Sequence, residues 1–125
     1  MNREKQIQYW RIGAREDWEV ARELVQAGRI RHGLFFAHLA LEKLLKAHVS
    51  RHTDALAPRI HSLLRLAAQT GLQLTAEQSA FLGRFDRFQI EGRYPDVLPV
   101  ELDYKTANQE LTRAREVFEW LENQF

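Results

Sequence analysis

Apolar residues recur at steps of three and four along most of this chain, a spacing typical of helices that bury one face. The first such pattern predicts a helix from Glu4 to Ala27, which Gly28 can end in a left-handed conformation. The last pattern follows Asp103, a residue type suited to the N-cap, and repeats without a break to Phe125. This last helix is expected in the seam of an antiparallel bundle or against another subunit.

The helix expected over residues 31–51 is the most apolar, and its apolar positions cover well over half of its circumference. Such breadth indicates contacts with several neighbours and therefore a central position. The remaining sector of this helix contains Phe35 and Leu39 together with Glu42, Lys43 and Lys46. We expect this sector either to meet a partner or to belong to a core whose outer turn is hydrated.

Two shorter helices are expected between the long ones. One lies within residues 60–71. The other begins at Thr75, where Gln78 completes a capping-box pattern, and ends near Gly92 because Pro95 cannot continue it. No long alternating strand pattern occurs in the sequence. We therefore predict an all-α fold, an up-and-down helical bundle of about five helices that forms a single domain over residues 1–125.

The composition limits the classes of function. The 125 residues include no cysteine, which excludes disulfides and cysteine-ligated metal sites. No apolar run reaches membrane-spanning length and the polar start is not typical of a secretory signal, so we expect a cytoplasmic protein with no membrane association. The net charge of +1 argues against tight binding to long nucleic acid. The basic excess within residues 27–93 could nevertheless face phosphates.

The sequence contains no complete motif for a metal ion or another cofactor. His48 and His52 are four residues apart, as in many zinc sites, but only Asp54 lies near them as a third ligand. The chain has no glycine-rich phosphate loop. We expect neither a metal ion nor another cofactor.

Three segments resemble motifs of the HEPN family, the higher eukaryote and prokaryote nucleotide-binding domain. They are FFAHLALEKLLKAHV (35–49), RIHSLLRL (59–66) and RYPD (93–96), in the order and spacing of that family. The resemblance covers essentially the whole chain. It implies a helical bundle that usually dimerises, with a groove between subunits. Many bacterial members look like partners of a minimal nucleotidyltransferase in a toxin–antitoxin-like pair.

Another branch of this family acts as metal-independent ribonuclease. Its motif is an Arg followed after four to six residues by a His, near the start of the fourth helix, where the His serves as general acid–base and the Arg holds the phosphate. In this chain all five histidines precede residue 62, so the expected helix has none. The pattern does occur at Arg31 and His38, in the second helix. We expect His38 and His48 instead to be partly buried and hydrogen-bonded between helices.

Other residues of the motifs are candidates for binding a nucleotide or a partner. Lys43 and Lys46 could line a basic groove for a nucleotide or an RNA phosphate. The default interpretation of Glu42 and Lys46, four residues apart, is an exposed ion pair that supports the helix. His61, at the opening of the third helix, either bonds to a neighbouring helix or contacts a ligand.

Arg93 and Tyr94 are the remaining candidates. Ending a helix requires only the neighbouring glycine and proline, so the arginine and the phenol must serve another purpose. Either they cap and pack the end of the fourth helix, or they form a recognition site for a partner or a phosphate, with Tyr94 as an acceptor of a nucleotidyl group.

The main hypothesis is therefore a non-catalytic or weakly catalytic homodimer that binds a nucleotide or works with a nucleotidyltransferase. One alternative is an endoribonuclease toxin that uses Arg31 and His38. A second alternative is a dimeric scaffold without a ligand.

Overall fold

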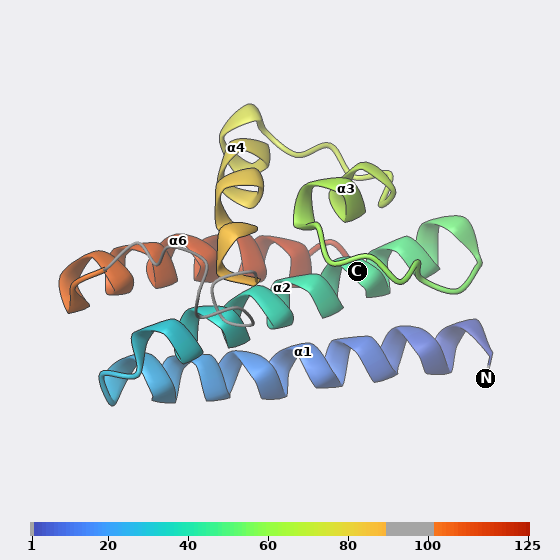
Figure 1. The fold of residues 1–125 in the computed structure, drawn as a ribbon. Coiled ribbons are helices and arrows are strands. Elements are labelled where there is room, and N and C mark those ends of the chain that lie inside the picture. Colours follow the sequence, from blue (N-terminus) through green and yellow to red (C-terminus); the bar gives the residue numbers. More distant parts are fainter. Residues whose placement is uncertain (1, 90–101) are drawn as a thin grey trace.

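The computed structural model describes residues 2–89 and 102–125, and within these ranges the fold is all-α (Figure 1). Its helices are α1 (Arg3–Gln26), α2 (Ile30–Thr53), α3 (Leu63–Ala68), α4 (Ala76–Phe85) and α6 (Tyr104–Glu122). The all-α prediction is confirmed. The three long helices begin and end within a few residues of the positions predicted from hydrophobic periodicity.

The three long helices lie side by side and carry the shorter ones on one side (Figure 1). α1 and α2 are antiparallel, whereas α6 runs in the same direction as α2. α2 packs against α1, α3 and α6, which is the central position predicted from its broad apolar surface. Within the described ranges, no helix has the length and hydrophobicity needed to cross a bilayer.

The core is built on the apolar face of α2. Leu34, Leu41, Leu44 and Leu45 have no exposed surface, and burial of each such side chain is worth about 1.5–3 kcal/mol. Most of the seam predicted for the last helix faces this core, although Tyr104 at its start is exposed. Its buried residues are Ala107, Leu111, Ala114, Phe118 and Leu121. The α6 seam therefore belongs to the bundle of its own chain.

A glycine sets the close approach of α1 and α2. A Cβ atom at Gly33 would lie 2.5 Å from Val25 Cγ2 and 3.1 Å from the carbonyl oxygen of Ala21, both on α1. A side chain at this position would therefore push the two helices apart. The turn between them uses Gly28 at φ +81°, which confirms the left-handed conformation predicted there.

The shorter helices differ in extent from the prediction. α3 begins only at Leu63, after Ser62, whose hydroxyl accepts a hydrogen bond from the Arg65 amide. His61 therefore precedes the helix and its N-cap. The helix predicted within residues 60–71 is shorter than expected because this side-chain cap starts it later.

α4 begins as predicted, with the capping box of Thr75 and Gln78. The predicted end near Gly92 lies outside the described residues, but α4 itself ends at Phe85, with Asp86 at the C-cap and helical structure again at 87–89. The predicted continuous helix was therefore wrong at Asp86. This break has neither glycine nor proline; it coincides with hydrogen bonds that the Asp86 carboxylate accepts from outside its own helix.

Candidate functional site

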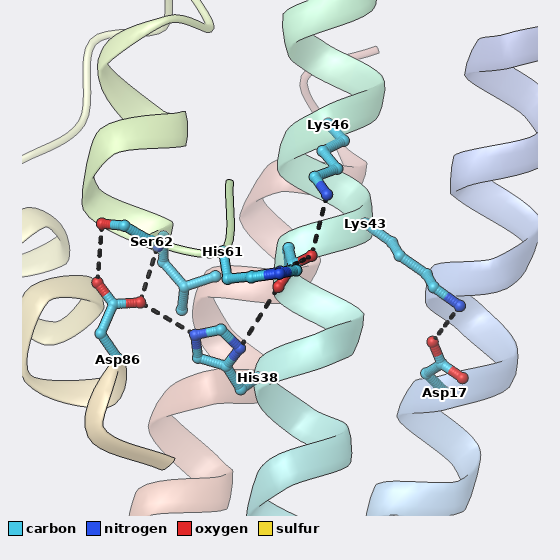
Figure 2. A network of polar contacts seen from close by, with 9 residues as sticks. Asp17, His38, Lys43, Lys46, His61, Ser62 and Asp86 are labelled. Carbon is cyan, nitrogen blue, oxygen red and sulfur yellow. Dashed lines mark hydrogen bonds and ion pairs between the residues drawn. The ribbon is translucent and has the colours of Figure 1, made fainter. Parts of the chain in front are cut away.

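A group of polar side chains joins α2 to the start of α3 and the end of α4 (Figure 2). We call this group the polar cluster. Its members are His38, Glu42, Lys46, His61, Ser62 and Asp86. Two of its α2 side chains, Glu42 and Lys46, come from the sector of that helix for which the sequence left two interpretations open.

Glu42 lies at the centre of the polar cluster. Its Oε2 accepts hydrogen bonds from Lys46 Nζ at 3.0 Å and from His61 Nδ1 at 3.1 Å. Its Oε1 lies 3.8 Å from His38 Nδ1. Glu42 is only 4% exposed and Lys46 only 7%, so the expectation of an exposed pair was wrong. Lys46, His61 and His38 surround the Glu42 carboxylate, and buried charges of this kind persist only when they are partnered.

Both candidate lysines are held by side chains of α1. Lys46 Nζ lies 5.3 Å from the ring centroid of Trp10, close enough for a cation–π contact. Lys43 Nζ lies 2.7 Å from Asp17 Oδ2, and a Cβ atom at Gly13 would lie 3.3 Å from the Lys43 stem. Each lysine charge is therefore balanced by a carboxylate within the chain. This pairing disfavours the open basic groove predicted for Lys43 and Lys46.

His38 connects the other side of the polar cluster to α4. The ring is 1% exposed, and its Nε2–H donates to Asp86 Oδ1 at 3.0 Å, because a carboxylate can only accept. Asp86 also accepts the amide hydrogen of Leu63 at 2.8 Å and the hydroxyl of Ser62 at 3.1 Å. Burial opposes the charged form of Asp86, but these hydrogen bonds outweigh it and hold the pKa of the carboxyl below its usual value.

The ribonuclease pattern is placed unfavourably for catalysis. Arg31 is exposed in the first turn of α2, whereas His38 lies two turns further along, buried against Phe85. The Nε2 atom of His38 is occupied by Asp86. A general base must reach the proton that it removes, so this geometry does not favour the ribonuclease alternative.

His48 also lies between helices. Its Nε2–H donates to the carbonyl oxygen of Leu121 at 2.8 Å, and its ring stacks on Phe125 with centroids 3.8 Å apart. Burial lowers the pKa of His48 despite the opposing effect of the Leu121 hydrogen bond. The expectation of buried, hydrogen-bonded imidazoles is confirmed for His38 and His48. Over residues 2–89 and 102–125, no three His, Cys, Asp or Glu side chains are grouped to hold a metal ion.

His61 is the remaining candidate that the structure describes. The side chain of His61 is 49% exposed while its Nδ1 bonds to Glu42 on α2, so the expected contact with a neighbouring helix is confirmed. Among the described residues, no hydrogen bond is found to the other ring nitrogen of His61, which can therefore make a further contact. Arg93 and Tyr94 lie outside the described residues.

Sequence reasoning missed Asp86, Asp17 and Trp10 as parts of this site. Asp86 had one local signal, since a charged residue follows directly after Phe85 in the apolar stripe of the fourth helix. Asp17 lies next to the core residue Trp18 on a helix with many charges, and nothing in its immediate sequence marks it.

Comparisons with known proteins agree with this architecture. The family model described as HEPN domain matches residues 7–124. The fold is similar to that of TT1696 from Thermus thermophilus, with a TM-score of 0.81 and 23% identity over 100% of both chains. It is also similar to ST0689, an archaeal HEPN homologue, with a TM-score of 0.72 and 21% identity over 94% of this chain and 96% of that chain. A comparison with curated proteins found no match.

Proposed function

The chain belongs to the HEPN domain family, and from this membership we propose that it is a non-catalytic binding domain. In this proposal the protein is a cytoplasmic homodimer that binds a nucleotide or works with a minimal nucleotidyltransferase in a toxin–antitoxin-like pair. Its function is to hold a ligand or partner rather than to cleave RNA.

The burial of His38 is the observation that carries this proposal. This histidine belongs to the Arg31–His38 pattern of the ribonuclease alternative, yet its ring is enclosed and bonded to Asp86. Freeing the ring for catalysis would break its hydrogen bond to the Asp86 carboxylate, which costs about 1–3 kcal/mol when the group left behind is buried. The hydrogen bonds therefore favour a structural role for His38.

The proposed binding surface follows the outer sector of α2. Phe35 and Leu39 are half-buried there, one turn apart, and Lys43 follows one turn later. We assign Phe35 and Leu39 to the contact between subunits. His61 and Lys43 are assigned to a ligand or partner at its edge, because their side chains are partly exposed even though each is already paired with a carboxylate. Arg93 and Tyr94 remain proposed recognition residues for the same partner or for a phosphate.

Calorimetry with ATP, GTP and a purified nucleotidyltransferase from the neighbouring gene tests the binding proposal. We expect saturable binding of at least one of them, weakened by Lys43→Gln combined with His61→Asn. Arg22→Gln is a matched control, because Arg22 is exposed and paired only with Glu19 in the described part of the chain. The absence of binding to all three would contradict the proposal.

Sedimentation velocity tests the homodimer. Phe35→Glu or Leu39→Glu should produce monomers that keep their helical content. If these variants abolish the dimer while nucleotide and partner binding are absent from the outset, the scaffold alternative is favoured. If the pure protein cleaves RNA and His38→Ala abolishes the cleavage, the ribonuclease alternative is favoured instead.

A further inference from the structure

α1 begins and α2 ends at the same end of the molecule (Figure 1), and several arginines line the surface there. Arg3, Arg11 and Arg51 line a groove beside Phe125, which we call the arginine groove. An adjoining groove shares Arg3 and Arg51 and adds His52. Lys46 of the polar cluster and the nearby Lys43 lie earlier on α2 and are paired with Glu42 and Asp17, so the arginine groove is a separate cationic surface.

The arginines of this groove are held in place by contacts with the chain itself. Arg51 Nη1 donates to the carbonyl oxygen of Gln124 at 3.0 Å, and Arg3 donates to the carbonyl oxygen of Arg51. The guanidinium of Arg11 lies 4.1 Å from the ring centroid of Phe125, and that of Arg51 lies 5.8 Å from the same ring. These contacts use few of the five N–H donors of each guanidinium, so donors remain for a ligand.

The charges around the groove are not fully balanced at Arg51. Arg11 is paired with Glu122 at 3.3 Å. Arg3 is paired with Asp54 at 3.5 Å, but both side chains are largely exposed, which makes the pair weak. Glu4 also lines the groove and is bonded by Gln8.

Within residues 2–89 and 102–125, no carboxylate lies at ion-pair distance from Arg51. Arg51 and His52 are in the last turn of α2, where a cation already favours the helix. Stabilisation of the helix accounts for a positive charge at Arg51. It does not account for Arg51 and Arg3 together lining both adjoining grooves.

We propose that the arginine groove binds a single terminal phosphate, held by Arg51 and Arg3. Guanidinium groups match phosphate oxygens in a bidentate manner, and arginines fixed in advance lose less entropy on binding. One unbalanced cation suits a small phosphorylated ligand better than a long polyanion. This site goes beyond the proposed partner surface, because it shares no residue with Lys43, Lys46 or His61.

Titration calorimetry at low ionic strength tests this site with inorganic phosphate, AMP and adenosine. The wild-type protein should bind phosphate and AMP but not adenosine. Arg51→Gln should weaken both affinities by about tenfold or more, and Arg3→Gln should weaken them less. Arg51→Lys, which keeps the charge without the fork, should also weaken binding while preserving the helix terminus.

Arg22→Gln removes one arginine charge elsewhere on α1 and should leave phosphate binding unchanged. An equal loss in this control would overturn the proposal, as would the failure of the wild type to bind phosphate. AMP binding that is lost in Lys43→Gln with His61→Asn but kept in Arg51→Gln would also overturn it. That last result would leave the proposed function intact, so the two inferences fail separately.

Discussion

His38 Nε2 and Asp86 Oδ1 lie 3.0 Å apart, and this hydrogen bond ties the middle of α2 to the C-cap of α4. The same carboxylate accepts the amide hydrogen of Leu63, the first residue of α3. One side chain therefore fixes the relative positions of three helices.

Replacing Asp86 should destabilise the protein although the residue is not fully buried. We expect Asp86→Ala to lower the free energy of unfolding by about 1–3 kcal/mol, because His38 and the amide of Leu63 lose their acceptor. Urea denaturation monitored by circular dichroism measures this loss. Glu116→Ala, at an exposed position of α6, is the control. A change no larger than in the control would show that the contact contributes nothing to stability.

Acidification should reduce stability through His48. The pKa of this residue is lowered by burial from its ordinary value of 6.5, so below that pH the unfolded chain takes up a proton before the folded one does. Stability should therefore fall as the pH drops below about 6.5, until the folded pKa is reached. The residue adds no pH dependence above that value, because the ring is neutral in both states.

Unfolding experiments between pH 5 and pH 8 compare the wild type with His48→Gln. The glutamine amide can still donate to the carbonyl oxygen of Leu121 but does not titrate. The variant should show a shallower pH dependence, while His32→Gln, at an exposed position, should follow the wild type. Parallel curves for wild type and His48→Gln would refute this role.

Removing Glu42 should cost more than removing the whole ion pair. Glu42→Leu leaves the buried ammonium of Lys46 without its carboxylate, and we expect a loss on the order of 3 kcal/mol. The double variant with Lys46→Met removes both charges and should recover at least about 1 kcal/mol of that loss. Thermal and urea unfolding measure both variants. Additive losses from the two substitutions would contradict the coupling.

Two glycines should respond to alanine with opposite signs. Gly33→Ala forces a methyl group against Val25 and should destabilise the protein by about 1–3 kcal/mol. Gly83 is exposed within α4, and a Cβ atom there would meet only Leu64 Cδ2 at 3.5 Å. Gly83→Ala should therefore stabilise the protein by about 0.5–1 kcal/mol. Melting temperatures of the two variants test this difference, and a loss in both would refute it.

The sequence allowed accurate prediction of features that depend on near neighbours. The capping box at Thr75 and the N-cap at Asp103 involve residues three positions apart, and both are present. The apolar face of α2 could be predicted because its period is a property of the helix itself.

The polar cluster could not be predicted in the same way. His61 and Glu42 are 19 residues apart, and His38 and Asp86 are 48 apart. The sequence suggested an exposed Lys46 because Glu42 and Lys43, its neighbours on the same face of the helix, are charged. Its burial depends on other segments that cover it, Trp10 of α1 among them. No periodicity encodes such contacts, since they are decided when the helices pack.

The six residues of α3 are too few for a helix that is stable on its own. The amide of Leu63, its first residue, donates to Asp86 at the end of α4, so α3 is stable only while the end of α4 stays in place. In hydrogen-exchange terms, the backbone protons of α3 and of the last turn of α4 should open to solvent together, as one cooperative unit. The amides of α1 and α2, which pack closely at Gly33, would remain protected from exchange while α3 opens.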